Sequence, residues 1–104
     1  MRQFVRVASL EEITEGGGTA VEAGGREIAL FRVEGEIYAI DNVCPHLQGP
    51  LVEGILEGRI VSCPWHAWTF DVGTGRCTFS EDVRVERFEV RIRGTDVEVS
   101  LDLD

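Results

Sequence analysis

The residues best suited to chemistry are two cysteines and two histidines that fall in two short clusters. Cys44 and His46 form the first cluster, and Cys63 and His66 form the second after sixteen intervening residues. The chain has no other histidine. Because each cluster offers one thiolate and one imidazole, the two could bind metal at a shared site. Such ligands suit zinc, copper or iron-sulfur centres, whereas calcium and magnesium prefer oxygen.

The order of the ligand types distinguishes two kinds of metal site. A structural zinc site usually takes a closely spaced Cys pair followed by a His pair. Here each cluster mixes the two types, which suits a diiron cluster with two thiolates on one iron and two imidazoles on the other. Structural zinc is therefore the second interpretation.

The pattern Cys-x-His, sixteen residues, Cys-x-x-His resembles the Rieske 2Fe-2S signature, and a Pro follows each Cys. The similarity continues in residues 36–39 before the first cluster, in Gly49 after it, and in residues 68–75 after the second. It extends through most of the chain. The sequence is therefore identified as a member of the Rieske family.

This resemblance implies a ligand set for a Rieske-type 2Fe-2S cluster. Cys44 and Cys63 would bind the inner iron, and His46 and His66 would bind the outer iron through one ring nitrogen each. Imidazoles in place of two thiolates remove negative charge from the cluster. An added electron is then less costly, which raises the potential.

Rieske proteins of the cytochrome bc complexes resemble this pattern but add one Cys to each loop, joined by a disulfide. The corresponding positions here are Gly49 and Trp65. Cys77 is the only cysteine beyond the two ligands, and one cysteine cannot form an intramolecular bridge. We therefore expect the type without the disulfide, and we assign Cys77 no role.

The same high-potential proteins usually carry Ser and Tyr hydroxyls where this chain has Trp68 and Phe70. Hydrogen bonds to the cluster stabilise its reduced, more negative state. Their absence predicts a potential near the lower end of the roughly −150 to +300 mV Rieske range.

Two tryptophans flank His66. We expect Trp65, together with Leu47 and Pro64, to form an apolar docking rim around the exposed imidazoles. We expect Trp68 to be packed in the core.

Glycine-punctuated β patterns must position these clusters. Residues 26–33 and 36–40 are rich in β-formers and flank a Glu-Gly turn, which predicts a hairpin. Residues 85–93 and 97–101 predict a second hairpin, with one slip of phase near Arg87.

Near the N-terminus, residues 3–7 suggest a strand. Ser9 and Glu12 have the spacing of a capping box, which predicts one helical turn at residues 10–13. Glycine clusters bracket residues 19–23 and favour short strands.

The expected fold is all-β, a Rieske-like antiparallel β-sandwich with an inserted cluster-binding subdomain of two loops. We expect residues 1–104 to form a single domain, with a cluster-binding segment at about residues 42–80. That segment holds all three prolines and all three cysteines.

A formal net charge of −9 argues against nucleic acid as a partner, and would steer the chain toward basic docking surfaces. No stretch approaches the length of an apolar membrane span, and the N-terminus lacks the apolar region of a signal peptide. We therefore expect a cytoplasmic protein without a membrane partner.

Both histidines are used by the expected cluster, so the chain cannot supply the mononuclear iron site of an oxygenase. We therefore expect no substrate site and predict a soluble one-electron carrier between a reductase and a terminal oxygenase. One alternative, also from resemblance, is the small subunit of an assimilatory nitrite reductase. Another is a zinc-stabilised binding module without a redox role.

Overall fold

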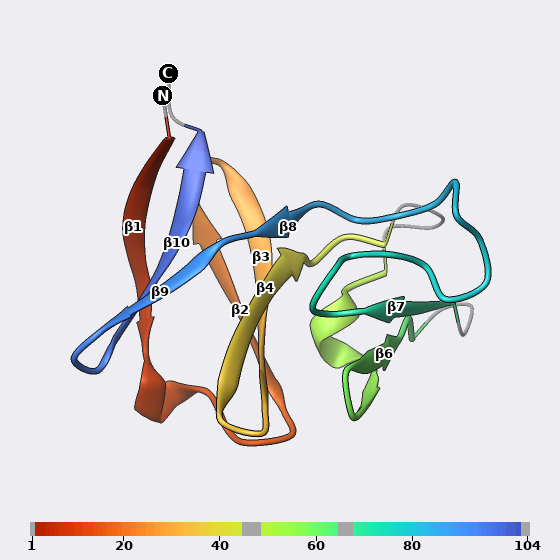
Figure 1. The fold of residues 1–104 in the computed structure, drawn as a ribbon, viewed down its shortest axis with the longest axis horizontal. Helices are drawn as coiled ribbons and strands as arrows, with labels where there is room; N and C mark the ends of the chain where they lie inside the picture. The colour runs from red at the N-terminus through yellow and green to blue at the C-terminus, as the bar shows by residue number, and fades with distance from the viewer. Residues whose placement is uncertain (1, 45–48, 65–67, 103–104) are drawn as a thin grey trace.

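Short strands joined by glycine-rich turns build three antiparallel sheets in the computed structural model, which describes residues 2–44, 49–64 and 68–102 (Figure 1). The strands are β1 (Arg2–Ser9), β2 (Gly18–Ala23), β3 (Arg26–Val33), β4 (Glu36–Asp41), β5 (Ile55–Glu57), β6 (Ile60–Ser62), β7 (Thr69–Asp71), β8 (Arg87–Phe88), β9 (Val90–Arg93) and β10 (Asp96–Asp102). Two 3₁₀ turns accompany them, η1 (Leu10–Glu12) and η2 (Leu51–Glu53). No helix in these residues has the length and apolar character needed to cross a membrane.

The sheets divide the molecule into a sandwich and a smaller unit. One sheet has the order β1-β10-β9 and the second has the order β2-β3-β4-β8. These two form the sandwich, on the left in Figure 1, and the β5-β6-β7 sheet lies at the other end. The all-β fold with an inserted subdomain is therefore confirmed.

The predicted hairpin of β3 and β4 is confirmed, and it forms a wall shared by both units. Alternate residues of a strand point to opposite faces. Ile28 and Leu30 accordingly lie in the core of the sandwich, whereas Phe31 and Val33 lie in a second core on the other face. Burial on both faces explains why β3 has a continuous apolar run.

The second core joins the hairpin to the smaller unit. Its buried members come from β3, β4, η2, β6, β7 and the segments around them: Ala29, Phe31, Val33, Ile40, Cys44, Leu51, Val61, Cys63, Phe70, Val72, Cys77 and Val85. Cys44 and Cys63 therefore lie in the apolar contact region between the smaller unit and the β3–β4 hairpin.

The N-terminal elements also agree with the sequence. The strand expected at residues 3–7 is β1, the turn is η1, and residues 19–23 lie in β2. The backbone N–H of Ser9 donates to Glu12 Oε1 at 2.8 Å, which is the Glu half of the capping box.

The second hairpin is confirmed for residues 90–93, which pair with β10, but the prediction of one strand over residues 85–93 is wrong. The chain forms β8 and β9 on either side of Glu89, and these strands belong to different sheets. β8 pairs with β4, and β9 pairs with β10. The phase slip near Arg87 reflects this crossing, because a chain that leaves one sheet for another does not keep a single alternation.

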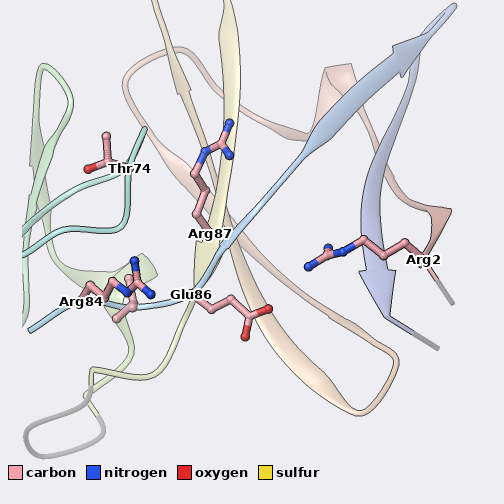
Figure 2. A pocket seen from close by; sticks show the side chains of 6 residues that line it. Arg2, Thr74, Arg84, Glu86 and Arg87 are labelled. Carbon is pink, nitrogen blue, oxygen red and sulfur yellow. The ribbon is translucent and has the colours of Figure 1, made fainter. Parts of the chain in front are cut away.

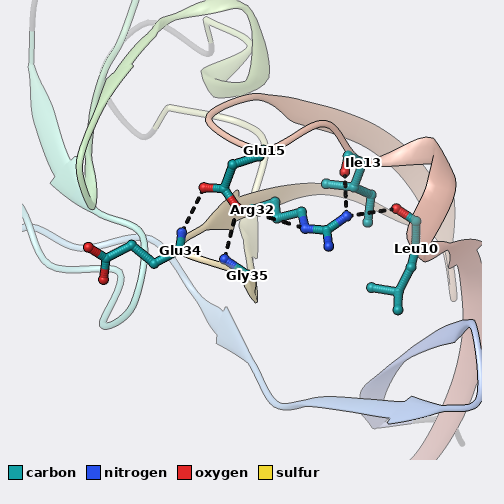
Figure 3. A network of polar contacts seen from close by, with 6 residues as sticks. All are labelled: Leu10, Ile13, Glu15, Arg32, Glu34 and Gly35. Carbon is teal, nitrogen blue, oxygen red and sulfur yellow. Dashed lines mark hydrogen bonds and ion pairs between the residues drawn. The ribbon is translucent and has the colours of Figure 1, made fainter.

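A polar network fixes the N-terminal turn to the hairpin (Figure 3). Arg32 Nη1 donates to the carbonyls of Leu10 at 3.4 Å and Ile13 at 3.3 Å. The Glu15 carboxylate accepts the backbone N–H groups of the turn at residues 34–35 at 2.7 and 2.8 Å. One side chain from each segment therefore binds the backbone of the other.

Candidate metal centre

The first cysteine lies at the base of a loop that begins just after β4. The backbone N–H of Cys44 donates to the carbonyl of Gly49 at 2.9 Å, and Val43 lies opposite Pro50 in an antiparallel bridge. These contacts close the loop directly beside the cysteine.

The second cysteine lies at the base of a similar loop between β6 and β7. The Cys63 N–H donates to the Trp68 carbonyl at 2.7 Å, and Ser62 lies opposite Thr69 in the strand pair. In both loops the cysteine N–H bonds to a carbonyl five residues further on. The two loop bases are therefore built alike at the level of the backbone.

The structure brings the two predicted cysteines into the same buried region. Cys44 is 0% exposed and Cys63 is 2% exposed, and both belong to the second core. His46, His66, Leu47 and Trp65 lie outside the described residues. Two thiols beside apolar side chains fit an iron-sulfur cluster, since sulfur ligands suit it and exclusion of water protects it.

Asn42 organises the first loop, and sequence reasoning missed it. Its side chain is 1% exposed; Oδ1 accepts the Val52 N–H at 2.7 Å, and Nδ2 donates to Glu27 Oε1. The Asn42 carbonyl accepts the Leu51 N–H at 2.7 Å. The sequence offered one signal for this role: Asn42 is a polar residue between an apolar strand and the candidate ligand Cys44.

Gly54 has a matching role for the second loop. A Cβ atom added to Gly54 would lie 1.7 Å from the carbonyl oxygen of Ser62, the residue before Cys63. Only glycine allows this approach of the end of η2 to β6. Nothing in the sequence around Gly54 marks it as a contact point.

Aromatic side chains follow the second loop. Trp68 packs against the second core, as predicted, and its ring meets that of Phe79 edge-on at 5.5 Å. Phe79 is 61% exposed, and Pro64 of the predicted rim is exposed too. Phe79 therefore adds an exposed apolar residue that the sequence pattern did not indicate.

Cys77 has a structural position. It is buried in the second core, bridges to Phe70, and its N–H donates to the Val83 carbonyl at 3.1 Å. Cys77 forms no disulfide.

Comparison with known proteins identifies the family. A model of the Rieske 2Fe-2S domain matches residues 3–92. The chain belongs to the Rieske family. The predicted family and its 2Fe-2S cofactor are thereby confirmed, and the structural zinc interpretation is wrong.

Among relatives of this Rieske chain, the ferredoxin component of the naphthalene 1,2-dioxygenase/salicylate 5-hydroxylase systems of Ralstonia sp. is 39% identical, covering 97% of this chain and 98% of the relative. The ferredoxin of carbazole 1,9a-dioxygenase from Nocardioides aromaticivorans IC177 is 33% identical, with a TM-score of 0.87 over 93% of this chain and 96% of that one. A complex of reduced oxygenase and oxidised ferredoxin of carbazole 1,9a-dioxygenase contains a chain that is 28% identical, with a TM-score of 0.86, covering 97% and 95%.

The Rieske fold is also shared with a putative NADH-dependent nitrite reductase small subunit from Mycobacterium tuberculosis. The TM-score is 0.90 at 22% identity, and the match covers 100% of this chain and 99% of that one. At this identity the likeness extends to the fold alone. The ferredoxins above, at 33–39% identity, are more similar to this chain in sequence than this small subunit is.

Proposed function

We propose that this Rieske chain is a soluble one-electron carrier that passes electrons from a reductase to a terminal oxygenase. The observation that carries the proposal is the 39% identity to a dioxygenase ferredoxin component over nearly the full length of both chains. The solved complex of a similar ferredoxin with its oxygenase supports the terminal oxygenase as a partner. The chain then acts as a component of an oxidoreductase system and has no substrate site of its own.

In this proposal Cys44 and Cys63 bind one iron of the cluster, and His46 and His66 bind the other. The support is the shared geometry of the loop bases, where each cysteine is buried and its N–H is bonded within the loop. The bound cluster supplies reversible one-electron transfer. The second core excludes water from the thiolate side, and Asn42 holds the first loop in place.

Docking would combine charge with a small apolar contact. Leu47, Pro64 and Trp65 form the proposed rim, and exposed Phe79 extends it. Nineteen acidic against ten basic residues favour partners with basic docking surfaces. A small, weak interface suits a carrier that must release each partner.

We further propose that residues 1–104 act as a single domain, that residues 42–80 bind the cluster, and that the protein works in the cytoplasm. The support for the segment is that both loops and η2 lie within it.

A pair of cysteine variants tests the ligand assignment. Cys63→Ser and Cys77→Ser both change a buried thiol of the second core. We expect Cys63→Ser to abolish the Rieske EPR signal of the reduced protein, and Cys77→Ser to keep it. A normal signal from Cys63→Ser would refute the assignment.

A reconstituted assay tests the carrier role. In an assay that combines a reductase and a terminal oxygenase of a dioxygenase system from the same organism, oxygenase turnover should require the holoprotein. Stable co-purification with a large sirohaem subunit, and no support of oxygenase turnover, would instead select the nitrite reductase alternative.

A further inference from the structure

Three arginines, two in the segment before β8 and one at its start, carry no ion pair within the described parts of the chain. Arg76, Arg84 and Arg87 are all exposed. Five other arginines do form ion pairs with acidic residues: Arg6, Arg26, Arg32, Arg59 and Arg91. Arg2 and Arg93 have no such ion pair either, but Arg76, Arg84 and Arg87 lie within one stretch of twelve residues that also holds exposed Glu81, Asp82 and Glu86, and we call these three the arginine patch.

Two arginines of the patch face each other across the backbone. Arg76 lies directly opposite Arg84 in an antiparallel bridge, and like charges in such a position are destabilising. Glu86 lines the same surface depression as Arg84 and Arg87, but it already pairs with Arg26 at 2.8 Å. Figure 2 shows Arg84 and Arg87 projecting from one segment while Arg2 reaches toward them from β1.

The backbone that carries these arginines is fixed by hydrogen bonds. The Arg76 carbonyl accepts the Asp71 N–H at 2.8 Å, and the Glu86 carbonyl accepts the Asp41 N–H at 2.8 Å. Between them, Gly75 lies against Val85, where an added Cβ would be 2.3 Å from the Val85 carbonyl oxygen. A fixed backbone lowers the entropic cost of using the arginines in recognition.

The arginine patch lies close in sequence to the exposed side chain of Phe79. Arg76 and Arg84 flank residues 77–83, and Phe79 is three residues from Arg76. Three residues span at most about 11 Å. Since a standard interface covers about 800 Å² on each partner, one docked surface can cover both Phe79 and the arginines.

We propose that Arg76, Arg84 and Arg87 form a cationic docking contact for a cluster of carboxylates on the terminal oxygenase. The proposal rests on the carrier function argued above. All ten cationic side chains of this protein are arginines, whose planar guanidinium groups bind carboxylates through paired hydrogen bonds. A positive contact beside an otherwise acidic surface would also fix the orientation in which the carrier docks.

Two variants of equal charge test the contact. Arg84→Glu and Arg93→Glu each change the net charge from −9 to −9 − 2 = −11. Arg93 is exposed and ends β9, at the opposite end of the molecule from the patch (Figure 1). The Kd for the partner terminal oxygenase, measured at low salt with the holoprotein, should rise about fivefold for Arg84→Glu. Arg93→Glu should leave the Kd unchanged or lower it.

The direction in which the Kd for the oxygenase changes tests the proposed contact. If the net negative charge alone guided docking, both variants would bind as well as the wild type or better, and that result would overturn the contact. If Arg84→Glu weakened binding to the reductase and not to the oxygenase, the assignment of the contact to the oxygenase would be overturned. A wild-type holoprotein that binds neither partner would refute the carrier function, and this inference with it. If Arg84→Glu fails to fold, Arg84→Gln replaces it in the test. This variant adds no negative charge, and its Kd for the oxygenase should rise by less than fivefold.

Discussion

The side-chain oxygen of Asn42 accepts the backbone N–H of Val52 at 2.7 Å, and the two residues flank the first loop. The amide of the same side chain donates to Glu27, and the carbonyl of Asn42 accepts the N–H of Leu51. One buried residue thus joins the two ends of the loop to each other and to the start of β3. Cys44 lies two residues beyond this junction, so its position depends on it.

Replacement of Asn42 by Ala should therefore impair both stability and cluster binding. The buried N–H of Val52 would lose its partner, at a cost of about 1–3 kcal/mol in the free energy of unfolding. Denaturant unfolding and the iron content per chain measure the two effects. Ser100→Ala is the control, because Ser100 is buried in the sandwich strand β10, away from the loops. Normal iron content in Asn42→Ala would contradict the positioning role.

Gly54→Ala should disturb the second loop. The new Cβ would lie 1.7 Å from the Ser62 carbonyl oxygen, so η2 and β6 would have to separate next to Cys63. We expect a loss of about 2–4 kcal/mol in unfolding free energy, with loss of the cluster. Gly17→Ala is the matched control, since its nearest neighbour would be 3.4 Å away. Equal stability of the two variants would show that β6 yields without cost.

The sequence identified those strands whose pattern is local. β3 has a continuous apolar run and a Glu-Gly turn to β4, and both signals come from neighbouring residues. The division between β8 and β9 was missed because it depends on pairing with β4 in one sheet and β10 in the other. Such long-range pairing leaves only a phase slip in the sequence.

The candidate site shows the same division. The types and spacing of Cys44 and Cys63 indicate a shared metal site from the sequence alone, and the second core contains both. The contacts of Asn42 with Val52 and of Gly54 with Ser62 link residues eight to ten positions apart. No periodicity or motif encodes those contacts, so only the folded chain shows them.

Glu15 should contribute stability that depends on pH. The N–H groups of Gly35 and Glu34, with a smaller effect of Arg32, lower the pKa of the Glu15 carboxyl in the folded protein. A lowered folded pKa stabilises the protein above the unfolded value of about 4.3, and this contribution disappears as pH falls through the folded pKa. Glu15→Gln should therefore have a lower Tm than the wild type at pH 7, and the gap should narrow toward pH 3.

The control for this prediction is Glu11→Gln, which makes the same charge change at an exposed residue of η1. It should follow the wild type across the pH range. A gap between wild type and Glu15→Gln that stays constant from pH 7 to pH 3 would show that the carboxylate charge is not what the turn recognises.

The reduction potential should lie near the lower end of the roughly −150 to +300 mV Rieske range. Phe70 is fully buried in the second core, and it has no hydroxyl to donate to a cluster held by the neighbouring loop. Hydrogen bonds to the cluster favour its reduced state, so a side chain without a donor leaves the potential low. A redox titration of the holoprotein, followed by EPR, measures the midpoint, and a clearly positive value would contradict the prediction.

The same reasoning predicts the effect of adding a donor. Phe70→Tyr should raise the midpoint by on the order of tens of millivolts, because the new hydroxyl follows the second loop, where a high-potential Rieske protein has its Tyr. Phe31→Tyr adds the same hydroxyl to the same core from β3 and should leave the midpoint unchanged. Equal shifts in the two variants would mean that general polarity of the core, rather than a directed hydrogen bond, sets the potential.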